Sequence, residues 1–177
     1  SEERGKMSAL FFLIVISTVF WSMFEQSGGS MTLFADRATD LTLFGMELTA
    51  AQFGSANAIF IILLSPLFAL TWPALLSNNI EPSTPAKFGL GIVQVGLGFG
   101  ALLIGLNNPD SAGLVSAWWL VLAYFLHTSA ELCLSPIGLS AVTKLSIARY
   151  VGVMMGAWFL ASAYGSYLAS ELAIFFS

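Results

Sequence analysis

The chain has 177 residues, of which 57% are apolar and only 9% are charged, with a formal net charge of −4. Soluble globular domains carry about 25% charged residues, so this composition, with a mean hydropathy of +0.85, excludes a soluble domain and indicates an integral membrane protein. The sequence contains no HExxH, CxxC, Walker loop, GxSxG or DxxD metal cluster, and no basic patch with interleaved aromatic residues. We therefore expect no enzyme, no metal site and no nucleic-acid partner.

Five long apolar runs follow one another, at about 7–35, 50–76, 88–106, 114–142 and 151–170. About 20 residues of helix cross the hydrocarbon core of a bilayer, and lipid offers backbone groups no other hydrogen-bond partner. The sequence therefore predicts an all-α membrane protein with five transmembrane helices, in one transmembrane domain over residues 1–177.

The basic residues lie between the runs and predict an orientation. If the amino terminus of the chain is cytoplasmic, five of the six lysines and arginines face the cytoplasm and only Arg37 lies outside. Cytoplasmic loops are enriched in Lys and Arg, so this orientation is favoured over the reverse.

Two glutamates, Glu25 and Glu131, interrupt the first and fourth apolar runs. An ionised carboxylate near the centre of a bilayer costs about 2.5–3.5 kcal/mol, so such residues typically mark a path for substrate, ions or protons. No lysine or arginine lies within these runs. His127, four residues before Glu131, is the one partner available inside a run, either as a proton relay or as a neutral residue that donates a hydrogen bond within the bundle.

Other polar residues recur at helical spacing on the apolar runs. Ser17, Trp21 and Glu25 share one face, as do His127, Glu131 and Ser135. Asn57 and Ser65 lie on the second run, and Trp158, Ser162 and Ser166 align on the fifth. Without a ligand these residues could equally serve helix packing, because small and hydroxyl side chains let membrane helices approach closely.

Four segments carry a family resemblance. ELCLSPIGLSAVTKLS (131–146) resembles the tenth-helix signature of the proton-dependent oligopeptide transporters, the POT or PTR family of the major facilitator superfamily. FWSMFEQSGGSMTLFADR (20–37), IILLSPLFALTW (61–72) and MMGAWFLASAYGSYLA (154–169) resemble that family's seventh, eighth and eleventh helices. The four segments occur in the family's order and together cover most of the chain.

The resemblance implies that the chain forms helices seven to eleven, part of the carboxyl-terminal six-helix bundle of a twelve-helix transporter. The amino-terminal six-helix half and the twelfth helix would then be its missing partners. It further implies proton-coupled symport of di- and tripeptides across the cytoplasmic (inner) membrane, driven by the proton gradient without a cofactor. A part of this size is not expected to transport alone.

The same resemblance implies roles for individual residues. Glu131 would hold the amino terminus of the peptide, and Glu25 would couple transport to protonation as well as line the binding site. The remaining implied substrate-binding residues are Trp21, Asn57, Trp158 and Ser162. Two alternatives stay open: the same fold could carry another small solute such as nitrate, or the chain could be a non-transporting scaffold subunit whose glutamates bind a partner helix.

Overall fold

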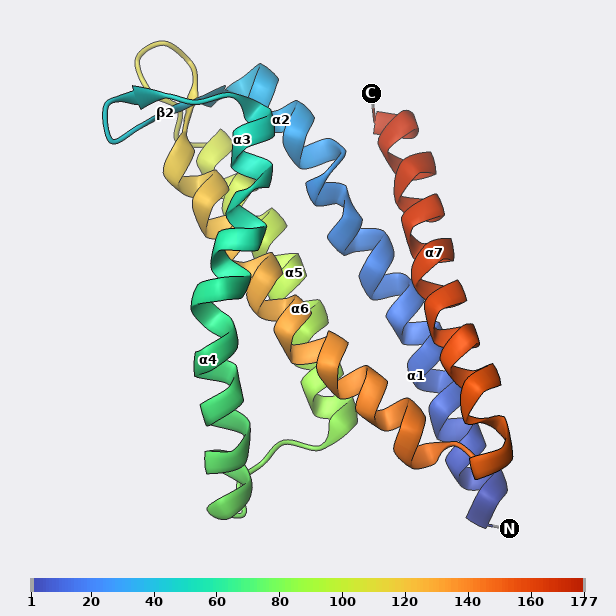
Figure 1. Cartoon of the computed structure of the whole chain (residues 1–177). Helices are drawn as coiled ribbons and strands as arrows, with labels where there is room; N and C mark the ends of the chain where they lie inside the picture. The colour runs from blue at the N-terminus through green and yellow to red at the C-terminus, as the bar shows by residue number, and fades with distance from the viewer. Residues whose placement is uncertain (1, 177) are drawn as a thin grey trace.

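The computed structural model describes residues 2–176, which form a helical bundle with short connections (Figure 1). Each of the five apolar runs is mostly helical; the exceptions are residues 28–29, 55 and 114–116. The helices are α1 (Glu2–Phe24), α2 (Ser30–Ala38), α3 (Ala50–Gly54), α4 (Ala56–Ser77), α5 (Thr84–Leu106), α6 (Ala117–Leu145) and α7 (Val151–Phe176). By length and composition, five helical segments can cross a membrane: Glu3–Ala38, Ala50–Ser77, Thr84–Leu106, Ala117–Leu145 and Ala148–Ile174.

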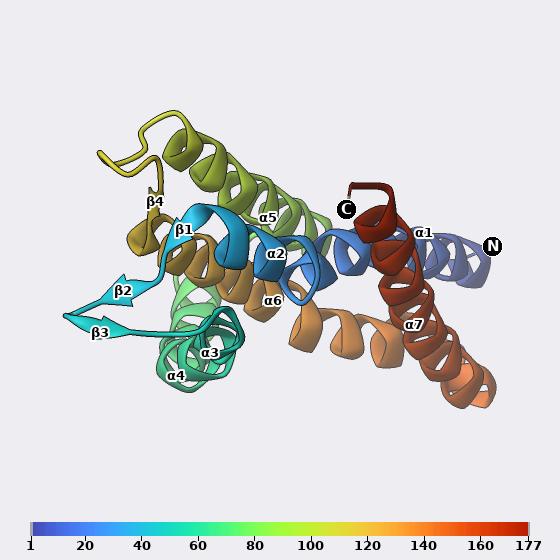
Figure 2. The same cartoon turned by 90° about the horizontal axis from the view of Figure 1, so that it is seen from above.

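The bundle has two sides with a helix pair between them. Helices α1 and α7 lie side by side, α4 stands apart on the opposite side, and α5 and α6 run between them (Figures 1 and 2). Two hydrophobic clusters hold this arrangement together. Their buried members include Leu10, Phe20, Phe88, Val95 and Leu134 in one, and Met31, Ala35, Leu120 and Ala123 in the other.

The first apolar segment is not one continuous helix. Helix α1 ends at Phe24, a 3₁₀ turn covers Glu25–Ser27, and α2 begins at Ser30. Gly28 and Gly29 join the two parts, and Gly29 has φ −111° and ψ −94°, outside the helical region. Glycine has the least steric restriction and a low helix propensity, so a break at this pair is chemically reasonable. The sequence prediction of one uninterrupted span did not include this break.

Glycines on α5 make its close contact with α6. Gly91, Gly98 and Gly105, spaced seven residues apart, are buried, and a Cβ atom on each would meet α6 side chains or backbone. At Gly98 the added Cβ would lie 2.5 Å from Cδ2 of His127. Small residues let membrane helices approach closely, which explains this spacing. Gly89 and Gly96, on the same helix, have no such neighbour within 4 Å.

The connections at one end of the bundle contain short strands. These are β1 (Thr39–Asp40), β2 (Thr42–Leu43), β3 (Met46–Glu47) and β4 (Val115–Ser116). Strands β2 and β3 form a hairpin whose turn residues, Phe44 and Gly45, both have positive φ, as a type I′ turn requires. Strand β1 pairs in parallel with β4 and so ties the end of α2 to the start of α6. At the other end of the bundle, a 3₁₀ turn at Ala148–Tyr150 links α6 to α7.

Candidate functional site

Glu131 on α6 is joined to α4 by a hydrogen bond in the middle of the bundle. The Asn57 Nδ2 atom, near the start of α4, donates to Oε2 of Glu131 at 3.2 Å and to Oγ1 of Thr128 at 3.0 Å. Asn57 and Glu131 are half-buried, whereas Thr128 is fully buried. Two residues predicted separately from the sequence, Asn57 and Glu131, are thus brought together by the packing of α4 on α6.

Tyr124, one turn before Thr128 on α6, contacts the turn that separates α1 from α2. Thr128 donates its hydroxyl proton to the backbone carbonyl of Tyr124 at 2.8 Å, and the Tyr124 hydroxyl donates to the carbonyl of Ser27 at 3.2 Å. Ser27 closes the 3₁₀ turn that begins at Glu25. Tyr124 thus contacts both regions: its backbone carbonyl accepts from Thr128 beside Asn57, and its side chain donates to the turn that carries Glu25.

Glu25 lies on the open side of this turn. Its side chain is exposed and lines a cavity of about 310 Å³ together with Gly28, Gly29 and small residues of α7, including Ser166 and Ser170. Within residues 2–176, no lysine, arginine or histidine forms an ion pair with either carboxylate. Among the described residues, both acids therefore lack a cationic partner.

Gln26 is buried, whereas its neighbour Glu25 is exposed. The Nε2 atom of Gln26 donates to the carbonyl of Ala169 on α7 at 2.9 Å, and its Oε1 atom accepts from Ser30 at 2.6 Å. These bonds fasten the 3₁₀ turn to α7 and to the start of α2. Because Gln26 turns inward, its neighbour Glu25 turns toward the cavity.

The predicted aromatic residues lie in more enclosed positions. The Trp21 ring is half-buried, and its Cβ packs at the position of Gly165 on α7. The Trp158 ring is only 2% exposed and lies against Gly138 of α6 and Phe88 of α5. In this conformation Trp158 belongs to the core, so a ligand could reach it only after the surrounding side chains move.

Ser162 and His127 also have defined places. Ser162 is half-buried, and its hydroxyl donates to the carbonyl of Trp158 at 3.3 Å. His127 is buried beside Gly98, and its ring stands edge-on to Phe99 at 4.9 Å between centroids. Within the described chain, both ring nitrogens of His127 are buried and neither forms a hydrogen bond with Glu131 or any other group. His127 is therefore not the partner of Glu131 in this structure.

Thr128 is the site residue that the sequence pattern did not single out. Residues three and four positions before Glu131 both lie on its side of the helix, and the histidine at the fourth position drew attention first. The sequence feature that could have identified Thr128 is its hydroxyl group three residues before Glu131. Choosing between the two requires the rotation of α6, which is set by packing against Gly98.

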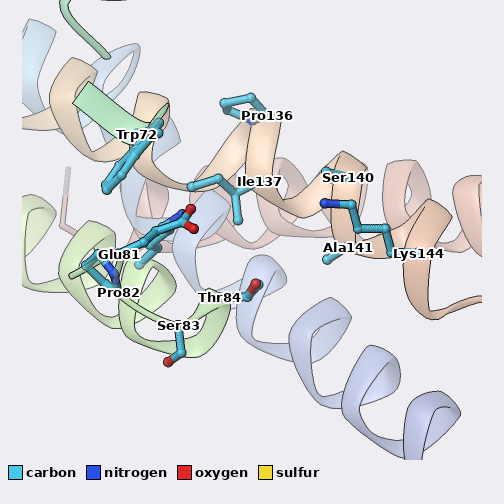
Figure 3. Close-up of a pocket in the computed structure, with 11 residues that line it drawn as sticks. Trp72, Glu81, Pro82, Ser83, Thr84, Pro136, Ile137, Ser140, Ala141 and Lys144 are labelled. Atoms are coloured by element: carbon cyan, nitrogen blue, oxygen red, sulfur yellow. The ribbon is translucent and has the colours of Figure 1, made fainter. Parts of the chain in front are cut away.

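A second cavity lies away from Glu25 and Glu131, between the ends of α4, α5 and α6. It has a volume of about 460 Å³ and is lined by residues that include Trp72, Glu81, Ser140 and Lys144 (Figure 3). Lys87 also lines it, is buried, pairs with Glu81 and lies 4.4 Å above the Trp72 ring. Within residues 2–176, no group of three or more His, Cys, Asp or Glu side chains is arranged to hold a metal ion.

The chain belongs to the POT family, whose model (PTR2) matches residues 1–177. It is 42% identical to the peptide transporter YePEPT of Yersinia enterocolitica over 170 residues, which are 95% of this chain and 33% of that protein. It is 39% identical to dipeptide and tripeptide permease A of Chromobacterium violaceum, over 97% of this chain and 34% of that protein. The chain thus spans about a third of the length of the curated relatives it matches. The family consists of transporters, not enzymes.

Solved structures give the same assignment. A peptide transporter POT in complex with sulfate superposes with a TM-score of 0.89 at 40% identity, covering 100% of this chain and 35% of that chain. A POT family transporter in complex with a thioalcohol-conjugated peptide superposes with a TM-score of 0.87 at 30% identity, covering 98% of this chain and 36% of that one. The all-α membrane fold and the family resemblance predicted from the sequence are confirmed, and the roles of the six site residues stay predictions.

Proposed function

We propose that this chain is the carboxyl-terminal part of a proton-coupled symporter that carries di- and tripeptides across the cytoplasmic membrane. Support comes from relatives that are named as peptide transporters and as dipeptide and tripeptide permeases. Because the chain spans a third of their length, the transporting unit would include an amino-terminal six-helix half and a twelfth helix. The start of this chain would lie on the cytoplasmic side, an orientation supported by the five of six basic residues that would then face the cytoplasm.

The hydrogen bond from Asn57 to Glu131 is the observation that carries this proposal. It holds a carboxylate in a defined orientation between two helices, and no cation of the described residues neutralises it. A peptide ammonium has three donors and a positive charge, so it matches such a carboxylate better than a neutral group does. The peptide carboxylate would be held by a basic residue of the amino-terminal half.

Glu25 is the proton-coupling residue in this proposal. A carboxylate on a broken membrane helix, facing a cavity, can exchange its proton with water as that cavity opens to one side or the other. Protonation removes its charge and changes how the two halves of a transporter attract each other. The proton gradient then supplies the driving force, and no cofactor is needed.

Substitution of Glu25 by Gln tests the coupling in the full-length protein, reconstituted in liposomes with an inward proton gradient. The variant is expected to exchange labelled dipeptide for unlabelled dipeptide across the membrane, because glutamine keeps the size of Glu25 and the other five binding residues are intact. It is not expected to concentrate the dipeptide, because it lacks the titrating group. Glu47→Gln, which neutralises an exposed acid of the β2–β3 hairpin, is the matched control and should accumulate the peptide normally.

Unchanged accumulation by the Glu25→Gln variant would contradict the coupling role. Competition by unlabelled dialanine against labelled dipeptide uptake separates peptide transport from transport of nitrate or another small solute. Wild-type behaviour after neutralisation of both glutamates, with co-purification of a fixed partner, would instead support a scaffold subunit.

A further inference from the structure

Thr128 contacts Asn57 beside Glu131 but is itself fully buried and therefore cannot contact a ligand in this conformation. Its side chain is fully buried on α6, one turn before Glu131. Its Oγ1 atom is 2.8 Å from the carbonyl oxygen of Tyr124 and 3.0 Å from Nδ2 of Asn57. Any effect of Thr128 on a substrate must therefore act through one of these neighbours.

The single hydroxyl proton fixes the direction of these bonds. A backbone carbonyl can only accept, so Thr128 donates its proton to Tyr124. The hydroxyl oxygen is then left to accept, and Asn57 must present an N–H to it. The other N–H of the same amide points to Glu131. Both donors of Asn57 are thus used within the protein.

This leaves the Asn57 carbonyl oxygen, Oδ1, with no hydrogen-bond partner in the described part of the chain. Reversal of the amide would place Oδ1 against the Glu131 carboxylate and leave the Thr128 oxygen without a donor. Two acceptors facing each other repel, so Thr128 and Glu131 together hold the amide in one orientation. The half-buried pair then offers a ligand only acceptors: Oδ1 of Asn57 and the oxygens of Glu131.

We infer that Thr128 is a positioning residue that orients Asn57 and so selects a primary ammonium at this subsite. The inference rests on the proposed function and adds a determinant of its specificity. A free peptide amino terminus can donate to both acceptors at once. An acylated amino terminus has one N–H and no charge, so it can satisfy only one of them. When Glu131 is protonated, Thr128 still keeps Oδ1 directed outward.

Thr128→Val in the full-length transporter tests this inference, because valine keeps the branched shape and loses the acceptor. The readout is competition with labelled dipeptide uptake by dialanine and by N-acetyl-dialanine. The half-inhibiting concentration of dialanine is expected to rise about tenfold, the effect of one lost hydrogen bond, while that of the acetylated peptide stays nearly constant. Thr128→Ser, which restores the hydroxyl, should return the ratio toward that of the wild type.

Equal changes for both peptides would show a merely structural role and would overturn the inference, as would an unchanged ratio. If the valine variant does not accumulate in the membrane, Thr128→Ala also lacks the acceptor and carries the same expectation. A wild-type protein that ignores dialanine altogether would instead contradict the proposed function. The two failures are therefore distinguishable.

Discussion

Adjacent residues of the site have opposite surroundings because of the 3₁₀ turn that begins at Glu25. Gln26 is buried and fastened to α7, and this contact directs the Glu25 carboxylate into the cavity beside Ser166 and Ser170. Glu131 is oriented in a different way, by an amide donor from a neighbouring helix. The position of Glu25 thus follows from the backbone turn, whereas that of Glu131 follows from a side-chain hydrogen bond. In the proposed function, Glu25 exchanges a proton and Glu131 holds the ligand.

Glu131→Gln is the residue-scale test of ligand binding, because it removes the charge and preserves the size of the side chain. A hydrogen bond to a charged group contributes about 1.5–3 kcal/mol, so we expect the KM for dialanine to rise roughly 10- to 100-fold. Initial rates of uptake by the full-length protein at several dialanine concentrations measure this. Glu47→Gln is again the matched control, and equal KM values for the two variants would exclude Glu131 from the binding site.

At this scale the sequence identified Asn57 and Glu131 as separate candidates, and their contact follows only from the packing of α4 on α6. The sequence suggested His127 as the neighbour of Glu131, whereas in the structure it is Thr128 that contacts Asn57 beside Glu131. Positions 127 and 128 differ by about 100° around a helix, and apolar residues on every face of a membrane helix leave no amphipathic pattern to fix its rotation. Sequence spacing therefore identified this helix and Glu131 but did not single out Thr128, which contacts Asn57 in the structure.

Among the elements, α5 illustrates what glycine composition can and cannot predict. Many glycines in the third span predict a smooth packing surface. In the structure this surface is on α5 and packs against α6. Only one row of the glycines, which includes Gly91 and Gly98, makes the contact, while Gly96 faces away. Which row is used depends on the partner helix. The polar and glycine residues at 25–30 interrupt the apolar run, but a run of this length still predicts one span, and only the structure shows that the helix itself breaks there.

Gly98→Ala should weaken the pairing of α5 with α6, whereas Gly96→Ala should not. The new Cβ at Gly98 would lie 2.5 Å from the His127 ring, and the Ala123 carbonyl at 3.3 Å closes the other side. Overpacking of this kind costs about 1–3 kcal/mol, more than the helix propensity gained by replacing glycine. Thermal unfolding of the full-length protein in detergent measures the difference, and equal midpoints for the two variants would contradict the packing described here.

Over the whole molecule, helices leave large apolar surfaces uncovered. The described residues of α4 include none that is buried, and Ile62 and Leu70 are each more than 70% exposed. Lipid can cover such surfaces, and so can the remaining helices of a transporter twice or three times as long. Fold class and family were predictable from composition and four short motifs, because these signals are spread over many residues of the chain. The site depends on single contacts between helices, which composition does not encode.

In the proposed transporter, Glu25 and Glu131 face one cleft between the two halves and meet their positive charges there. An experimental structure of the full-length protein with bound dialanine tests this most directly. We expect the peptide ammonium nitrogen at about 3 Å from an oxygen of Glu131 and from Oδ1 of Asn57, with Glu25 facing the same cleft. A peptide bound elsewhere, or Glu25 and Glu131 directed toward lipid, would contradict the account.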